Sequence, residues 1–201
     1  ITDEDVVKIE KQIDVVEKLA VNTTELEHQC LYFAKGELAR QKEKDDKKAM
    51  EMYMKAIHIT LPDFDGKNPL RNNLLTFDEI MIINAIAILH AKADDIMTAV
   101  QLGMWLKKYM EEKIVDGTMK IAKYPMILYN LSNWLGRENC HKEALKMADL
   151  GIRFCIRYGN LAFFPILVFN KGGALAELGK IDQAKKYLHQ SVTIFEAMDR
   201  P

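Results

Sequence analysis

The C-terminal part of this chain repeats one pattern: an apolar helix, a turn with glycine, and a second helix with alanine near its start. Leu135-Gly136 and Leu178-Gly179 mark the two turns, and Ala144 and Ala184 open the two second helices. The glycines are 43 residues apart and the alanines 40. A repeat on this scale predicts helical hairpins stacked side by side. Such stacks form binding grooves rather than catalytic pockets.

Composition narrows the class of protein further. With 201 residues, 49% hydrophobic and 28% charged, the chain can bury a sizeable core. A net charge of −1 argues against direct binding of nucleic acid, which usually requires an excess of lysine and arginine. No apolar run reaches the roughly 18 residues of a membrane span. Cys30, Cys140 and Cys155 lack metal-type spacing and are typical of reduced, mostly buried thiols in a cytoplasmic protein.

The N-terminus suggests that the chain is part of something longer. It begins Ile1-Thr2-Asp3, with no initiator methionine and no signal-peptide pattern. We therefore expect a chain that was cut or processed, with an upstream segment that holds part of the activity. Residues 1–21 are expected to form an amphipathic helix, which is either a connector from an upstream domain or a cap on the repeats. Residues 22–201 are expected to form the repeat domain.

Apolar residues recur with a period near 3.6 between turn signals, which predicts helices. The spacing of Thr24 with Glu27, and of Thr76 with Glu79, indicates two capping boxes at helix starts. About nine helices are expected, over residues 3–20, 24–42, 47–60, 76–91, 94–113, 118–136, 141–158, 162–178 and 181–199.

Two features interrupt this periodicity. Residues 61–75 are rich in proline, aspartate and asparagine and form a long connection, which is either a functional loop or a spacer. Pro125 and Pro165 are expected within the first turns of their helices, where a missing amide costs little.

Motifs for catalysis or metal binding are not found in the sequence. It has no nucleophile elbow, phosphate loop, zincin motif or glycine-rich cofactor turn. The five histidines are scattered, and neighbours such as Cys140 and His141 point about 100 degrees apart on a helix. We therefore expect no enzymatic activity, no cofactor and no metal.

Several short segments together resemble one bacterial family. They are Leu75-Thr76-Phe77-Asp78-Glu79-Ile80, Tyr129-Asn130-Leu131-Ser132, Glu143-Ala144-Leu145, Gly151-Ile152-Arg153-Phe154-Cys155 and Leu178-Gly179. In order and spacing they resemble the C-terminal repeat domains of Rgg- and PlcR-type transcription regulators from Gram-positive bacteria. The resemblance covers most of the chain from about residue 28 onward.

The resemblance implies an all-α fold, a tetratricopeptide-like right-handed superhelix of about nine antiparallel helices. In that family a helix-turn-helix DNA-binding domain precedes the superhelix, and this sequence lacks that part. The superhelix often binds a small signalling peptide on its concave face and mediates dimerisation. The repeats here are irregular, with 50, 45 and 40 residues between Ala49, Ala99, Ala144 and Ala184. They depart from a regular repeat of about 34 residues, as repeats in the family do.

We therefore expect the ligand-sensing and dimerisation domain of a cytoplasmic transcription regulator. A short peptide or another small ligand in the concave groove would control an upstream DNA-binding domain that is missing from this chain. The expected partners are that ligand and a second copy of the chain, with DNA reached only through the missing domain and with no membrane. The main alternative is a tetratricopeptide protein–protein interaction scaffold with no DNA role. A purely structural dimerisation module is a third.

The candidate groove residues lie on the first helices of the pairs, which line the inner surface in such repeats. They are Asn84, Asn130, Asn133, Asn170 and Lys171. An asparagine amide can bond both the C=O and the N–H of an extended peptide, and apolar pockets between the asparagines would add specificity. The family resemblance supports Asn84 and Asn130 in particular. The alternative is that these asparagines bond to neighbouring helices inside the repeat.

Aromatic and apolar residues give two further expectations. Either the side chains of Tyr124, Tyr129, Phe163 and Phe169 wall the groove or they belong to the core. The last helix carries an apolar stripe and has no further helix after it in the repeat. We therefore expect a second copy of the chain to bury this stripe, which predicts a homodimer. Its members are Ile181, Ala184, Leu188, Val192 and Phe195.

Overall fold

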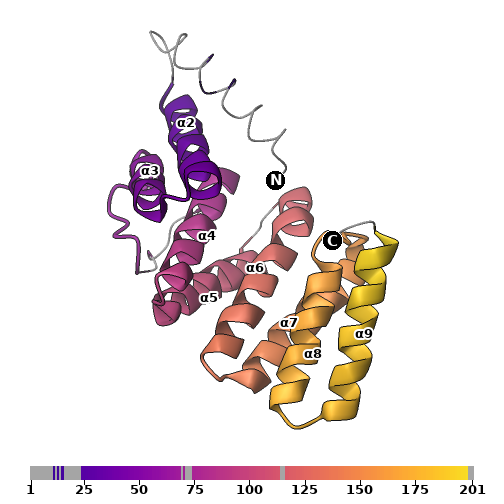
Figure 1. Cartoon of the computed structure of the whole chain (residues 1–201). Coiled ribbons are helices and arrows are strands. Elements are labelled where there is room, and N and C mark those ends of the chain that lie inside the picture. The colour runs from indigo at the N-terminus through magenta and orange to yellow at the C-terminus, as the bar shows by residue number, and fades with distance from the viewer. Residues whose placement is uncertain are drawn as a thin grey trace. The chain divides into compact units, whose positions relative to one another are not determined.

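The computed structural model describes residues 11, 13, 15, 24–68, 70, 74–113 and 116–198, and all regular structure within these residues is helical (Figure 1). The all-α class is therefore confirmed. The connector or capping helix expected over residues 1–21 lies outside the described residues, apart from three helical positions. The chain divides into two compact units, residues 1–90 and 91–201. None of the described helices is long and apolar enough to cross a membrane.

The first unit contains a helical hairpin followed by an apolar helix. Helix α2 (Glu25–Leu38) continues into a π-helical turn, η2 (Ala39–Glu43), and packs against α3 (Asp46–His58). Helix α4 (Phe77–Lys92) is apolar on all sides and correspondingly buried. Both predicted capping boxes are confirmed, with Thr24 and Glu27 bonded reciprocally at the start of α2, and Thr76 and Glu79 before α4.

The connection between α3 and α4 is held by two histidines. The Nε2 atom of His58 lies 2.8 Å from the Phe64 carbonyl oxygen, and that of His90 lies 3.0 Å from the Gly66 carbonyl oxygen. Because one histidine comes from each flanking helix, the short stretch from Phe64 to Gly66 is anchored to both of them.

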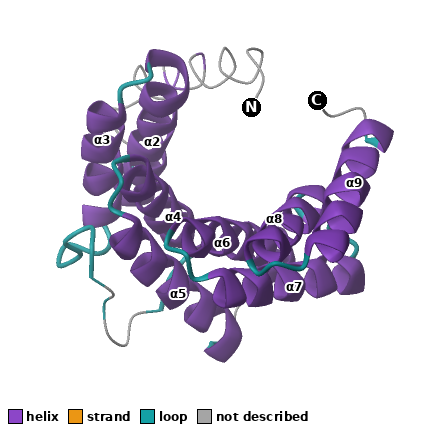
Figure 2. Ribbon diagram, turned by 60° about the horizontal axis from the view of Figure 1, so that its bottom comes forward, coloured by secondary structure: helices purple, strands orange, loops and turns teal. Residues whose placement is uncertain are grey.

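The second unit contains the repeated hairpins. Its helices are α5 (Ile96–Glu112), α6 (Gly117–Arg137), α7 (His141–Tyr158), α8 (Phe164–Glu177) and α9 (Ile181–Ala197). Each helix from α5 to α9 packs against the next, and α8 also contacts α6 (Figure 2). The core where α6, α7 and α8 meet includes Leu135, Ala144 and Ala174, whose small alanines let the helices approach closely.

The turns of the repeat differ from the expectation at one position. Asn139 and Gly179 have left-handed backbones (φ 58° and 73°) and lie 40 residues apart, the same offset that separates Ala144 from Ala184. Gly136, which the sequence suggested as the turn residue, instead lies inside α6. Asparagine can replace glycine at the turn because its short polar side chain tolerates the left-handed conformation.

The prediction for one of the two prolines is wrong. Pro165 lies at the start of α8 as expected, but Pro125 lies well inside α6, because that helix begins at Gly117. A proline there cannot donate a hydrogen bond to the carbonyl of Ile121, four residues earlier. The side-chain amide of Asn160 donates to that carbonyl instead, at 2.7 Å.

Candidate functional site

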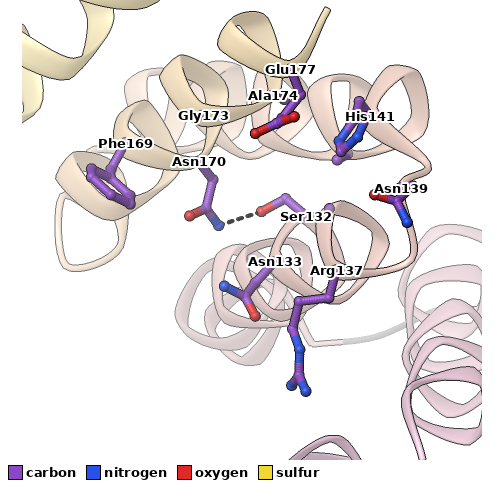
Figure 3. A pocket seen from close by; sticks show the side chains of 12 residues that line it. Ser132, Asn133, Arg137, Asn139, His141, Phe169, Asn170, Gly173, Ala174 and Glu177 are labelled. Atoms are coloured by element: carbon purple, nitrogen blue, oxygen red, sulfur yellow. Dashed lines mark hydrogen bonds between the residues drawn. The ribbon is translucent and has the colours of Figure 1, made fainter. Parts of the chain in front are cut away.

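A pocket of about 340 Å³ lies in the second unit between α6, the start of α7 and α8 (Figure 3). Polar side chains and small residues share its lining. The lining residues are Ser132, Asn133, Gly136, Arg137, Asn139, His141, Ala144, Phe169, Asn170, Gly173, Ala174 and Glu177. The pocket is therefore built mainly by two helices that are both first members of their hairpins, which is where the repeat predicts a groove.

Asn170 connects the two sides of this pocket. Its Nδ2 donates to the hydroxyl of Ser132 at 2.7 Å and to the Tyr129 carbonyl at 3.3 Å, so it bridges α8 to α6. Ser132 in turn donates to the same carbonyl at 2.8 Å. The Asn170 side chain thus has a structural role through its nitrogen, while no contact in the described residues engages its Oδ1.

The other predicted asparagines lie in different surroundings. Asn133 is exposed and lines the pocket. Asn130 is 7% exposed and lies 40 residues before Asn170, in the same repeat position, but it is not among the lining residues. Asn84 is 4% exposed and belongs to the first unit. Two of the four predicted asparagines, Asn133 and Asn170, are thus brought together.

Lys171 is held by two neighbours and does not line the pocket. Its ammonium group lies 2.7 Å from an oxygen of Asp149 on α7 and 4.1 Å from the centre of the Tyr187 ring on α9. Burial lowers the pKa of Lys171, but the hydrogen bonds and charge interactions with Asp149 and Tyr187 together outweigh this and raise the pKa overall. In this structure Lys171 joins three consecutive helices.

The charged groups of the pocket lie at its edges. The Arg137 guanidinium turns away from Ser132 and Asn170 and bonds the Ala91 carbonyl at 2.8 Å and the Asp94 carboxylate at 3.1 Å (Figure 3). Glu177, at the end of α8, is exposed. The space between Asn133 and Asn170 therefore holds neutral amides rather than a free charge.

Of the four aromatic residues considered for the groove, Phe169 lines the pocket, and its side chain is 49% exposed. Tyr129 and Phe163 stack on each other with ring centres 6.1 Å apart. Tyr124 is buried and donates to Glu111 at 2.5 Å, and burial followed by this bond raises the pKa of its hydroxyl. Tyr124 therefore belongs to the core.

Sequence reasoning missed the small residues and Arg137 in the lining. The available signal was a pair of adjacent glycines, Gly172 and Gly173, inside a strongly apolar helix where glycine is unfavourable.

In the described part of the chain, no group of three or more His, Cys, Asp or Glu side chains is arranged to hold a metal ion.

Fold and pocket together define the class: a repeat protein made of helical hairpins, with a polar and apolar pocket between first helices. A family model described as tetratricopeptide repeat matches residues 167–197, which contain most of α8 and all of α9. A search of curated proteins found no match.

Two kinds of solved structure resemble the whole chain. Bacillus thuringiensis PlcR in complex with the peptide PapR7 and DNA aligns at a TM-score of 0.68 with 17% identity, over 98% of this chain and 72% of PlcR. Apo PlcR aligns at 0.70 with 16% identity, over 97% and 74%. Tetratricopeptide-like repeats of a Podosopora anserina putative kinesin light chain align at 0.61 with 14% identity, over 98% and 88%. At these identities the likeness shows the tetratricopeptide-like fold.

Proposed function

We propose that this chain is the ligand-sensing domain of a cytoplasmic transcription regulator and that it binds a short signalling peptide in the pocket between α6 and α8. The observation that carries the proposal is the placement of Asn133 and Asn170 around one pocket, next to the exposed ring of Phe169. The likeness to PlcR, a structure of which contains a peptide and DNA, supports the same assignment.

Amide groups suit an extended peptide because each offers donors and an acceptor to a backbone. Asn133 is exposed, and the Oδ1 of Asn170 accepts from no described group, so both can meet a peptide N–H. Asn130 extends the same repeat position toward the previous hairpin. Lys171 is proposed as a further contact, for which it would have to exchange its bond with Asp149 for a ligand, and Asn84 remains a separate candidate within the first unit.

Arg137 lines the pocket and bonds Ala91 and Asp94 at the turn before α5, within the second unit. A peptide that favours one packing of α6 against α8 would therefore bias the position of this turn. Such a bias regulates an attached DNA-binding domain only if the peptide binds one state more tightly than the other.

The first experiment selects a displayed library of random heptapeptides on the whole chain and measures the best synthetic peptide by calorimetry. Asn133→Ala should weaken binding about tenfold, or roughly 1.4 kcal/mol, without changing the melting temperature. Gln190→Ala, which removes an exposed amide from α9, is the matched control and should bind normally. Equal affinity in Asn133→Ala would contradict the assignment of the pocket.

Dimerisation is part of this proposal. Ile181 and Val192 on α9 are 50% and 51% exposed, and a second copy of the chain would cover them. A monomer by light scattering at high protein concentration would rule this out. The second candidate is an interaction scaffold without a DNA role, which is equally consistent with the likeness to the tetratricopeptide-like repeats of the putative kinesin light chain. If the chain is such a scaffold, it should be monomeric and should bind segments of a partner protein.

A further inference from the structure

Two glycines in the pocket wall have no packing reason to be glycine. A Cβ added at Gly136 or at Gly173 would meet no atom within 4 Å, although both residues lie inside helices. The next residue behaves differently, because a Cβ at Gly172 would lie 2.8 Å from the Leu188 side chain and 3.1 Å from its backbone nitrogen. Packing against α9 thus explains Gly172 but leaves Gly173 unexplained.

Glycine inside a helix is unfavourable compared with alanine, because it loses more backbone freedom on folding. Two such residues that line one pocket keep open a space that methyl groups would otherwise enter. Ala144 and Ala174 line the same pocket and continue this small-residue wall, which consists of Gly136, Ala144, Gly173 and Ala174. The wall is apolar and presents no side chain larger than a methyl group.

The remaining surroundings indicate what fills the space. Phe169 offers an exposed aromatic ring at one end, and Arg137 is already engaged outside the pocket by Asp94 and Ala91. An anionic ligand group would therefore find no free counter-charge from Arg137, and the charged group that remains in the lining is the exposed carboxylate of Glu177. The volume of about 340 Å³ is near the lower end of the roughly 300–1,000 Å³ of ligand pockets, which suits one large side chain rather than a folded partner.

We propose that this pocket is the subsite for one bulky apolar side chain of the bound peptide, and that Gly136 and Gly173 are its specificity-determining residues. This rests on the proposed function, because the peptide backbone is held by Asn133 and Asn170 on either side. The glycines set how large the anchoring side chain can be, and the ring of Phe169 packs against it.

The test uses the best heptapeptide from the selection and a second peptide in which its largest apolar residue is replaced by alanine. Both are titrated against the wild type, Gly173→Leu and the double variant Gly136→Ala with Gly173→Ala. The wild type should prefer the original peptide by about tenfold or more. In Gly173→Leu, affinity for the original peptide should fall to that of the alanine peptide, and the preference should vanish.

Stability separates this effect from misfolding. Replacing glycine inside a helix by alanine or leucine should leave the melting temperature unchanged or raise it. Gly117→Ala is the matched control, since Gly117 is also helical with open space around its Cβ but does not line the pocket. Because Gly117 is the first residue of α6, this variant should change the stability little, and it should bind the peptide as the wild type does.

The outcomes distinguish the two proposals. A wild-type preference that persists in Gly173→Leu overturns the subsite and leaves peptide binding intact. Selected peptides without a shared large apolar residue also overturn the subsite. Failure to select any peptide whose binding depends on Asn133 overturns peptide binding in this pocket, and the subsite with it.

Discussion

At the scale of single residues, the Asn160 side chain compensates for the backbone hydrogen bond that Pro125 removes from α6. The proline removes the amide that would bond the Ile121 carbonyl, and the Asn160 side chain supplies the donor from the loop before α8. Asn160→Ala should therefore lower the free energy of unfolding by about 1 kcal/mol. Urea unfolding measures this change.

The control is a double-mutant cycle with Pro125→Ala, which restores a backbone amide at position 125. In that background Asn160→Ala should cost less, because the carbonyl of Ile121 then has a helical donor. Equal costs in both backgrounds would show that Asn160 acts on the loop rather than on the helix.

Residue type alone identified two of the pocket residues, since asparagines on first helices can be recognised from the repeat. It could not separate Gly172 from Gly173, because the sequence does not say which of two adjacent glycines faces Leu188 and which faces open space. Nor could it show that Asn170 is partly committed to Ser132, which is 38 residues away in sequence. These distinctions depend on how α8 is rotated against its neighbours.

At the scale of elements, the hairpin of α2 and α3 is held by a half-buried polar network around Glu37. This carboxylate accepts from Arg40 at 2.6 Å, from Gln41 at 2.7 Å and from the hydroxyl of Tyr53. Burial alone raises the pKa of Glu37, but the hydrogen bonds from Arg40 and Tyr53 outweigh it, so the pKa is lowered overall. The network lies where α2 widens into η2.

A lowered folded-state pKa means that the ionised form of Glu37 stabilises the fold. The contribution is fully present above the unfolded pKa of about 4.3 and is lost as the pH falls through the lower folded value. Glu37→Gln should therefore be less stable at neutral pH and should lose less stability on acidification below about pH 4.3. Urea unfolding over a pH series tests this.

Tyr53→Phe provides the companion variant for the same network. It removes one donor to Glu37 and so raises the folded pKa of this carboxyl towards the unfolded value, which means that the acid-induced loss should be smaller and should end at a higher pH than in the wild type. Parallel pH profiles for the wild type and Glu37→Gln would mean that Glu37 has the same pKa in the folded and unfolded chains.

Helix positions were largely predictable because their signals are local. Both capping boxes span only four residues, and the apolar periodicity of α5 to α9 is carried within each helix. The errors occur where tertiary contacts override local rules. Residues 39–42 were expected to be ordinary α-helix but form part of η2, and α6 continues through Pro125.

At the scale of the whole molecule, the division into two units bears on how the chain folds. The second unit has its own buried residues on every helix from α5 to α9, including Leu102, Leu131, Ala148, Leu167 and Ala184. Its contacts are mostly between consecutive helices, as in repeat proteins whose stability is a sum of repeat and neighbour terms. Such a unit does not need distant segments to bury its core.

We therefore expect residues 91–201, expressed alone, to be helical by circular dichroism and to unfold in one cooperative thermal transition. The segment keeps the bonds of Arg137 to Ala91 and Asp94, and it keeps the whole pocket. Ala144→Asp is the control: position 144 is 2% exposed, so an unpaired carboxylate there should abolish the transition.

If the segment shows no cooperative unfolding, its hairpins depend on the first unit, and a ligand in the pocket would then stabilise the entire chain together. If it does unfold cooperatively, peptide binding and the proposed subsite can be measured on the second unit by itself.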